Sequence, residues 1–480
     1  MRRFVVYVYC FLLCNALAFA KTIKIHGFVT NLNSQNSFEI DDYRVTKDVA
    51  LELEIEKDDS GSSPVTFKPE DIRVGTELEI KGEYNEQTGD LLAKSIKVFL
   101  EDTRKIKRTA LLAQVPVLDK STAGWNGILF ADGQRVVVDD STQVMTRPNK
   151  GEKRQAKQDK NPASTEPVAL TGLDDLNLDT FVHYEGIRQK DGTVLASKVL
   201  FWHAELEPGE AKLWRELRPK IKEANYASFK SGEIKVAKSK YRLVPNKEAQ
   251  DYLSSLGESL IPAHQRSLPD GDPLKIPFKF YLVEDKAFNA GAYPNGVVIV
   301  NSGVFDVCEN EAQLAFVLSH EITHAVEKHT WQQHEYHKNA LMALRIGGMV
   351  GAGFGGKGVA DIANMVEAGI RNGYARSLEN QADRVGMENM LQSGYDIREA
   401  PRAWKAVSKK YGDRPTNLFW DNHDNNTTRR SYLMAELRNN YSDADYSELK
   451  KDNDEYRKIA QSVKNPVQGK KKVKVKVASK

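Results

Sequence analysis

The stretch LSHEITHAVEKH, residues 318–329, contains two histidines four positions apart, with a glutamate directly after the first. Apolar residues recur around it at helical spacing, which predicts a helix with one buried face. On such a helix His320 and His324 project from the same side, so both rings can reach one metal ion. Glu321 is rotated off this line and lies beside the ion, where it can take a proton from a water molecule. Because His-Glu-x-x-His also occurs by chance, the interpretation depends on a third ligand.

A catalytic zinc ion takes three protein ligands and keeps one position open. The stretch YARSLENQADRVG, residues 374–386, contains Glu379 and Asp383, which are again four residues apart on a helical pattern. Glu379 would bind the ion, and Asp383 would accept a hydrogen bond from the second ring nitrogen of a ligand histidine. Without the upstream motif, the same pattern would predict an amphipathic helix with solvated carboxylates. Together the two stretches predict one Zn²⁺ bound by His320, His324 and Glu379.

Other features near the motif receive simpler interpretations. His329, His334 and His337 are interpreted as solvated surface residues. The glycine-rich stretch at 346–358 lacks the Gly-x-x-x-x-Gly-Lys-Ser/Thr pattern of a phosphate loop, because Lys357 is followed by glycine. It indicates either a close-packed helix contact or a mobile flap next to the active site.

These motifs resemble those of the HtpX, BepA and Ste-type zinc endopeptidases, metallopeptidase family M48. The similarity covers about residues 240–435. Further stretches that carry it are YRLVPNKEAQDYLSSLGESL, NAGAYPNGVVIVNSGVF, YARSLE and NHDNNTTRR. The last matches the family's His-Pro-x-x-x-x-Arg element at His423 and Arg429, although Asp424 stands where proline is usual.

The resemblance implies a gluzincin protease domain that holds one zinc ion and hydrolyses peptide bonds. It also implies a substrate strand made of Gly296, Val297, Val298, Ile299 and Val300. An extended peptide could bind the exposed edge of such a strand through backbone hydrogen bonds. The alternative is an ordinary buried strand.

The motif match also suggests roles for two further residues. His423 would donate a hydrogen bond to the developing oxyanion, with Arg429 as an orienting residue or second donor. Alternatively, His423 would occupy the open zinc position in a resting state. Glu321 would act as the general base throughout.

Residues 21 to about 205 contain a β-rich pattern that occurs twice. One copy includes DIRVGTELEIKGEYNEQTGDLLAKSIKV from Asp71, and the other DLNLDTFVHYEGIRQKDGTVLASKVL from Asp175. Gly82 and Gly186 lie at the same distance from these aspartates. The repeat predicts a tandem pair of small antiparallel, barrel-like modules. They resemble small β repeats found on bacterial exported proteins.

The modules are predicted at 21–105 and 120–206, with an inserted basic loop at about 147–165. Each copy would open with a glycine-punctuated strand, KIHGFV at 24–29 and WNGILF at 125–130. Such barrels can bind oligonucleotides, but these strands lack the clustered exposed aromatic residues that base stacking requires. We therefore expect a spacer, docking surface or substrate-capture module and no nucleic-acid partner.

From 207 to 465 helical patterns dominate, including the stretch 208–241, and one strand-like block interrupts them at 277–301. This part would be the zinc protease domain. The predicted fold class is multidomain α+β: two antiparallel β-barrel-like modules, then a mainly α-helical gluzincin-type domain with a small β-sheet.

The first twenty residues, MRRFVVYVYCFLLCNALAFA, combine two arginines, a short apolar run and a small-x-small ending at Ala20. They predict a secretory signal at 1–20, cleaved near Ala20, and so an exported protein in the periplasm or the medium. The alternative is an uncleaved membrane anchor. Because Cys10 and Cys14 belong to the signal, only Cys308 remains for the mature chain, which cannot form an internal disulfide.

The composition, 40% hydrophobic and 28% charged, excludes wholesale disorder in this chain of 480 residues. Removing the two arginines of the signal lowers the formal net charge from +3 to +1, which gives no general attraction to nucleic acid. The lysine-rich tail at 466–480 is predicted to be solvated. The alternative is contact with a membrane or another anionic envelope surface.

The sequence thus predicts a secreted or periplasmic zinc-dependent endopeptidase that hydrolyses extended or misfolded proteins, in envelope protein quality control. Its partners would be protein or peptide substrates. Two alternatives stay open. One is a zinc-containing chaperone or scaffold that binds unfolded envelope proteins without proteolysis, and the other is a surface-binding module that acts through the repeats and the lysine tail. Glu321 argues against both, because neither structural zinc nor surface binding requires a general base.

Overall fold

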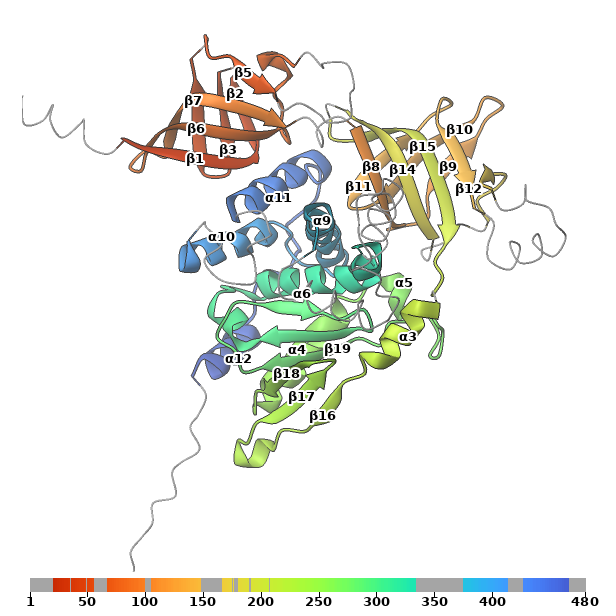
Figure 1. Ribbon diagram of the computed structural model, residues 1–480, viewed down its shortest axis with the longest axis vertical. Coiled ribbons are helices and arrows are strands. Elements are labelled where there is room, and N and C mark those ends of the chain that lie inside the picture. The colour runs from red at the N-terminus through yellow and green to blue at the C-terminus, as the bar shows by residue number, and fades with distance from the viewer. Residues whose placement is uncertain are drawn as a thin grey trace, which may run out of the picture.

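The computed structural model has two β-rich modules beside a mainly helical domain (Figure 1). It describes residues 20–34, 36–48, 50–55, 67–99, 105–147, 166–174, 176, 180–189, 191–206, 208–333, 374–412 and 426–465. The predicted signal, the inserted loop, the glycine-rich stretch and the lysine tail lie essentially outside these ranges. The arrangement confirms the predicted fold class.

The first module is a seven-stranded sheet in the order β1-β6-β7-β4-β3-β2, with β5 also paired to β7. Its elements are β1 (Ala20–Phe28), β2 (Asn31–Ser34), β3 (Ser37–Ile40), β4 (Tyr43–Lys47), β5 (Leu53–Ile55), the 3-10 turn η1 (Pro69–Asp71), β6 (Glu77–Asn85) and β7 (Asp90–Phe99). Buried and exposed residues alternate along β7, so one face of the sheet forms the apolar core of the module.

The second module is an eight-stranded sheet in which β8, β14, β15, β11, β10 and β9 are successive neighbours. In addition, β12 pairs with β15 and β13 pairs with β12. Its strands are β8 (Lys105–Leu111), β9 (Val117–Lys120), β10 (Trp125–Ala131), β11 (Gln134–Val138), β12 (Gln143–Thr146), β13 (Val168–Ala169), β14 (Thr180–Arg188) and β15 (Val194–His203).

The two modules therefore share one strand order, with β13 as an addition in the second. In this correspondence β8 matches β1, so the second sheet begins at Lys105 and not at the predicted residue 120. The proposed match between KIHGFV and WNGILF is wrong, because WNGILF lies in β10, which corresponds to β3. Both sheets also contain parallel pairs, such as β4 with β7 and β12 with β15. Among the described strands no ladder closes either sheet, although an isolated bridge between Leu112 and Ala131 joins the residue after β8 to β10.

Gly82 and Gly186 occupy the same structural position in the two copies. Each follows a register shift in the hairpin that contains it. A Cβ atom at Gly82 would lie 2.3 Å from the carbonyl oxygen of Leu92, and one at Gly186 would lie 2.3 Å from that of Leu195. Both bulges thus require glycine, which explains why the spacing of these residues reveals the repeat in the sequence.

The third domain contains a six-stranded sheet in the order β16-β17-β18-β19-β21-β20. Its strands are β16 (Lys220–Lys222), β17 (Gly232–Val236), β18 (Ser239–Leu243), β19 (Lys279–Val283), β20 (Ala290–Ala292) and β21 (Val297–Asn301). The expectation that 208–241 is mostly helical is wrong beyond α3 (Pro208–Glu216), because three strands follow it. Burial in β17 alternates with period two, the pattern of a strand with one buried face.

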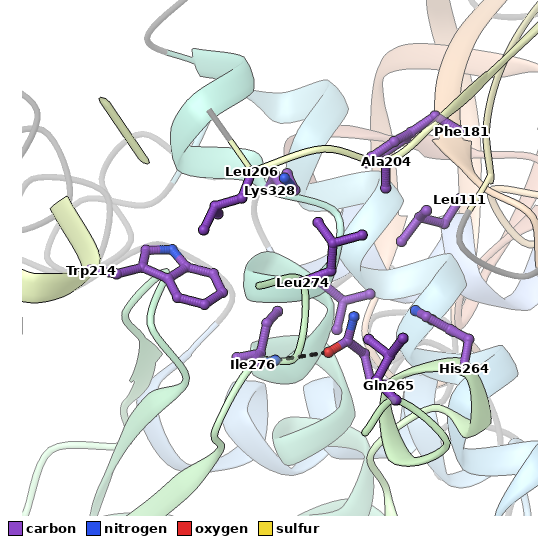
Figure 2. Close-up of a pocket in the computed structure, with 12 residues that line it drawn as sticks. Leu111, Phe181, Ala204, Leu206, Trp214, His264, Gln265, Leu274, Ile276 and Lys328 are labelled. Atoms are coloured by element: carbon purple, nitrogen blue, oxygen red, sulfur yellow. Dashed lines mark hydrogen bonds between the residues drawn. The ribbon is translucent and has the colours of Figure 1, made fainter. Parts of the chain in front are cut away.

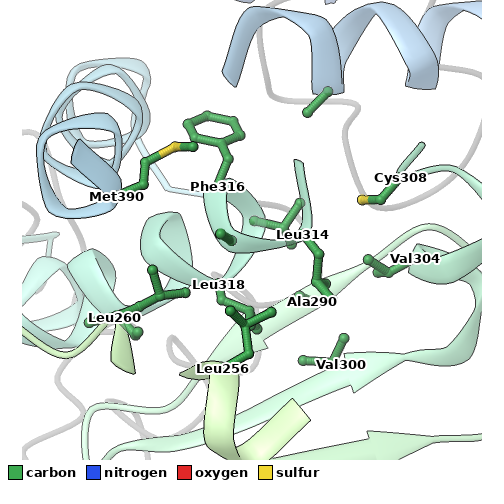
Figure 3. Close-up of a cluster of buried hydrophobic side chains, with 14 of the residues drawn as sticks. Leu256, Leu260, Ala290, Val300, Val304, Cys308, Leu314, Phe316, Leu318 and Met390 are labelled. Atoms are coloured by element: carbon green, nitrogen blue, oxygen red, sulfur yellow. The ribbon is translucent and has the colours of Figure 1, made fainter. Parts of the chain in front are cut away.

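Helices cover this sheet and build the rest of the domain. They are α4 (Lys247–Ser259), α5 (Ala263–Arg266), α6 (Glu311–Val326), α9 (Arg376–Gln392), α10 (Glu399–Tyr411), α11 (Asn426–Asn440) and α12 (Asp454–Lys464), with 3-10 turns η3 (Tyr226–Ser228) and η4 (Ser302–Asp306). Figure 3 shows the core, where Leu314 and Leu318 of α6 lie among side chains of α4, β21 and α9. Cys308 lies in this core and is free. No described helix is both long and apolar enough to cross a membrane.

A buried ionic group joins the second module to the helical domain. The guanidinium of Arg384, on α9, donates to both carboxylate oxygens of Asp132 at 2.6 and 2.5 Å and to the backbone carbonyl of the same residue at 2.9 Å. It also donates to the hydroxyl of Tyr432 on α11. Both charged side chains are almost completely buried, so the contact is part of the folded interior.

An apolar pocket lies where the second module meets α3, α5 and the end of α6 (Figure 2). Leu111, Trp214, Ile276 and Val326 contribute to its lining. The backbone N–H of Ile276 donates to the side chain of Gln265 at 3.0 Å and so fixes one wall.

Candidate metal centre

The helix that carries the motif, α6, has a capped start. The side chain of Asn310 accepts a hydrogen bond from the backbone N–H of Gln313 at 3.0 Å, and the Gln313 side chain accepts one from Glu309 at 2.9 Å. These bonds satisfy free donors at the helix start. All residues of α6 are buried, so its polar side chains face the interior of the domain.

His320, His324 and Glu379 come together as predicted. The two Nε2 atoms are 3.0 Å apart, and oxygens of Glu379 lie 3.5 Å from that of His320 and 3.7 Å from that of His324. All three donor atoms lie within 4.8 Å of one another in a buried position. Gly386 helps α9 to approach α6, since a Cβ atom there would lie 3.0 Å from the backbone nitrogen of His320.

The ring of His320 is oriented from its other side. Its Nδ1 lies 3.0 Å from a carboxylate oxygen of Asp383, as predicted, and that carboxylate accepts two further bonds from Arg429 at 2.6 and 2.9 Å. Burial alone would raise the pKa of Asp383, but the Arg429 guanidinium holds it below its ordinary value. The ionised carboxylate holds a proton of His320 on Nδ1 and so directs Nε2 toward the other candidate donors. Burial alone would lower the pKa of this ring, but its bonds to Asp383 and Glu379 raise the pKa to about 9, so a metal ion would displace the proton on Nε2.

The ring of His324 is oriented by a residue whose role the sequence analysis missed. His329 was interpreted as a solvated surface residue, and this interpretation is wrong: the side chain is buried. Its Nδ1 lies 2.8 Å from Nδ1 of His324, and its Nε2 lies 3.1 Å from the side-chain oxygen of Gln381. After α6 the chain turns at Lys328, whose φ is 56°. This turn brings the ring of His329 into contact with that of His324.

The hydrogen bonds of His329 define one consistent proton arrangement. Burial lowers the pKa of His329 to about 3, so the ring is neutral. With Nε2–H donating to Gln381, Nδ1 of His329 accepts from Nδ1–H of His324. With its proton on Nδ1, His324 presents an unprotonated Nε2 atom toward His320 and Glu379. His334 and His337 lie outside the described residues.

Glu321 lies between the metal donors and the sheet. The pKa of its carboxyl is raised to about 7, chiefly by burial and also by the nearby Glu379, although His320 and a hydrogen bond from the backbone of Ala292 act in the opposite direction. Ala292 belongs to β20, the end strand of the sheet. A carboxylate with a pKa near neutrality can both accept and return a proton.

Arg429 reaches this centre from α11. Besides binding Asp383, its guanidinium lies 3.7 Å from a carboxylate oxygen of Glu379 and 3.8 Å from the centre of the Trp404 ring. These contacts favour the orienting role over the role of an oxyanion donor. His423 lies outside the described residues, so its role as donor or zinc ligand stays a prediction.

The predicted substrate strand is not an exposed edge. Val297, Val298, Ile299 and Val300 lie in β21, which is fully buried and paired with β19 on one side and β20 on the other. Gly296, with φ of 83°, lies in the preceding turn. The expectation is therefore wrong for this strand, because both of its backbone edges are already occupied.

Two segments of the chain match known families. Residues 247–439 match peptidase family M48, and residues 26–97 match a domain of unknown function, DUF5666. The first segment contains the whole donor set, and the second lies within the first β module.

Similar proteins include the beta-barrel assembly-enhancing protease of Escherichia coli K12, which is 28% identical over 177 residues, 35% of this chain and 35% of that protein. A putative beta-barrel assembly-enhancing protease of Vibrio cholerae is 28% identical over 167 residues, 34% of this chain and 33% of that protein. The mitochondrial metalloendopeptidase OMA1 of Arabidopsis thaliana is 28% identical over 142 residues, 29% of this chain and 27% of that protein. The matches thus span about a third of each relative or less.

Proposed function

We propose that this chain, whose residues 247–439 form a peptidase family M48 domain, is a zinc-dependent endopeptidase. The observation that carries the proposal is the position of Glu321, a buried carboxylate next to His320, His324 and Glu379. A purely structural zinc site has no use for such a base.

His320, His324 and Glu379 would hold the ion. They fit zinc because two neutral imidazole nitrogens and one carboxylate are a common donor set of catalytic zinc sites. Both histidines also have their Nδ1 atoms engaged by Asp383 and His329, so that Nε2 faces the centre. When bound, zinc supplies the Lewis acidity that peptide hydrolysis requires.

The protein side chains then handle the proton. Glu321 accepts a proton from the attacking water at its carboxylate and returns it to the leaving amine. Its surroundings suit this task, because a carboxyl with a pKa of about 7 gives up and takes protons at neutral pH. Asp383 and Arg429 keep the ring of His320 in place during both steps.

The substrates we propose are extended or misfolded proteins of the cell envelope, met after export through the predicted signal at 1–20. The names of the bacterial relatives, which refer to β-barrel assembly, support this setting. The end strand β20 replaces β21 as the proposed peptide-binding edge. It pairs on one side only among the described strands, and Ala292 on it contacts Glu321.

The substitution Glu321→Gln tests the proposal. We expect the variant to keep zinc and fold but to lose at least about a hundredfold in cleavage of unfolded casein, because the amide cannot accept the proton. Zinc content and casein cleavage, each with and without chelator, are the measurements. Glu388→Gln is the matched control: burial also raises the pKa of Glu388 to about 7, but this residue lies more than two turns from Glu379 on α9. Full activity of Glu321→Gln would contradict the proposed function.

A further inference from the structure

The first β module docks on α11 through the open edge of its end strand. The backbone carbonyl of His26 in β1 accepts a hydrogen bond from the hydroxyl of Thr428 at 2.7 Å. The backbone N–H of Phe28 donates to the hydroxyl of Ser431 at 2.9 Å. Among the described strands β1 pairs with β6 alone, so these two side chains take the place of the next strand.

The second module docks in the same way, through β8. The backbone carbonyl of Thr109 accepts a hydrogen bond from the side chain of Gln381 at 3.1 Å. The backbone N–H of Leu111 donates to the carboxylate of Glu327 at 3.1 Å. Again an end strand offers the carbonyl of one residue and the N–H of the residue two positions later.

The docking groups occupy equivalent positions in the two copies. Phe28 pairs with Glu77, which lies five residues before the bulge glycine of the first copy. Leu111 pairs with Phe181, which lies five residues before the bulge glycine of the second copy. The same two backbone groups of the repeat therefore contact the helical domain twice.

On α11 the docking residues flank a residue of the metal centre. Arg429 lies between Thr428 and Ser431, and it binds Asp383, the hydrogen-bond partner of His320. The neighbouring Arg430 adds ion pairs to Asp41 and Asp42 of the first module, each at 2.6 Å. The start of α11 thus contacts the first module through Thr428 and Arg430, and it contacts Asp383 of the metal centre through Arg429.

On α9 the docking residue belongs to the chain of hydrogen bonds that ends at His324. The amide nitrogen of Gln381 binds Thr109 of the module, and its oxygen binds His329, which binds His324. The second module therefore contacts an orienting residue of His324 directly, whereas the first module contacts the residues on either side of Arg429, which orients His320 through Asp383.

We infer that the two β modules are positioning elements of the metal centre. Each uses the same two backbone groups of its end strand to fix a helix segment that carries an orienting side chain of one ligand histidine, Arg429 on α11 or Gln381 on α9. The inference rests on the proposed function, because it assigns the modules a role at the same site. A spacer or a substrate-capture module would act away from the zinc ligands, whereas the inferred role places the action of the β modules at these ligands.

The pair Thr428→Val and Thr428→Ser tests this inference in the full chain. Valine keeps the shape but loses the hydroxyl that binds the His26 carbonyl, whereas serine keeps the hydroxyl. We expect Thr428→Val to weaken zinc binding and lower kcat about tenfold with KM within about twofold, and Thr428→Ser to restore both. Competition with a chromophoric chelator gives the zinc affinity. Hydrogen exchange of the zinc-free protein should show faster exchange in the first turn of α11 in the valine variant.

Arg438→Gln is the matched control. Arg438 lies on the same helix and contacts Asn31 of the same module, but more than two turns from Arg429, so we expect unchanged zinc affinity and kcat. Ser431→Ala, which removes the acceptor for the Phe28 N–H, is the deciding variant if Thr428→Val fails to fold.

Wild-type zinc affinity in both Thr428→Val and Ser431→Ala would overturn the inference. Equal losses of zinc affinity and kcat in the valine and serine variants of Thr428 would overturn it as well. If the wild-type protein binds zinc but cleaves no substrate, the proposed function is refuted. The inference about the modules is then still decided by the zinc affinities of the Thr428 and Ser431 variants.

Discussion

At the scale of single residues, the sequence predicted the donor set but only part of what orients it. Helical spacing decides which side chains share a face, so His320 could be paired with His324 and Glu379 with Asp383, and the need of a zinc ion for a third ligand joined the two pairs. His329 could not be placed, because its position depends on the turn through Lys328 after α6 and on a partner fifty-two residues away. A histidine five positions after a ligand carries no helical signal once the helix has ended.

Asp383→Asn should weaken zinc binding about ten- to a hundredfold. The amide carries no charge to hold the proton of His320 on Nδ1, and its NH₂ group cannot accept from Arg429. Chelator competition measures the affinity. Asp396→Asn is the control, since Asp396 is an equally buried carboxylate that pairs with Arg398 at the start of α10. An affinity within about twofold of wild type for Asp383→Asn would contradict the assigned role.

At the scale of elements, Glu399 ties two helices of the helical domain together. This first residue of α10 accepts hydrogen bonds from the side chains of Asn310 at 2.8 Å and Gln313 at 3.0 Å, at the start of α6. Arg402 and Lys451 lie 2.5 and 3.0 Å from the same carboxylate. The start of α6, the helix that carries His320 and His324, is thus fixed by a charge on its neighbour.

The pH dependence of stability follows from Glu399. Burial alone would raise its pKa, but hydrogen bonds from Asn310, Gln313, Arg402 and Lys451 lower it from 4.5 to about 2. A lowered carboxyl pKa stabilises the folded state fully above pH 4.5, and this contribution is lost as the pH falls through about 2.

Glu399→Gln should therefore lower the free energy of unfolding by about 2 kcal/mol at pH 7, which is the contribution of a hydrogen bond to a charged group. Near pH 2 the two proteins should differ very little in this free energy, because the contribution of the charge is then largely lost. Urea unfolding of both proteins across this range is the measurement. A difference that stays constant from pH 7 to pH 2 would show that the charge is not the cause.

Some elements could be predicted from the sequence and others could not. The capped start of α6 and the bulged hairpins of the modules carry local signals, because caps and bulges demand particular residues. The sequence pattern wrongly predicts helix at β16 and β18, since their charged, solvated faces leave few apolar residues to show a period of two. The pairing of β21 inside its sheet depends on the distant β19 and β20, and no local pattern encodes it.

At the scale of the whole molecule, the modules and the helical domain form one interior. Arg384 of α9 and Asp132 of the second module are both almost completely buried, as are the contacts of the first module with Ser431. The sequence predicted the modules as separate units, because composition and repeats show where units begin and not how they pack.

Arg384→Met tests this shared interior. Removing the guanidinium leaves the Asp132 carboxylate buried without its bidentate partner, which typically costs about 3–5 kcal/mol. We expect the urea midpoint of unfolding to fall clearly for the whole protein. Fluorescence and circular dichroism measure this transition. Lys247→Gln breaks the exposed pair with Asp251 and should leave the midpoint unchanged. If the protein instead unfolds in two separate transitions and only one of them moves to lower urea, the second module folds independently.

Docking through backbone groups has a consequence for how the two copies can vary. A carbonyl and an N–H are present at every position except proline, so the docking strand is free to change its side chains while keeping its bonds. The chain shows this freedom: the docking positions are His26 and Phe28 in one copy and Thr109 and Leu111 in the other. A duplicated module of this kind can diverge in sequence along its attachment strand without detaching, so the strands β1 and β8 share a role but few residue types.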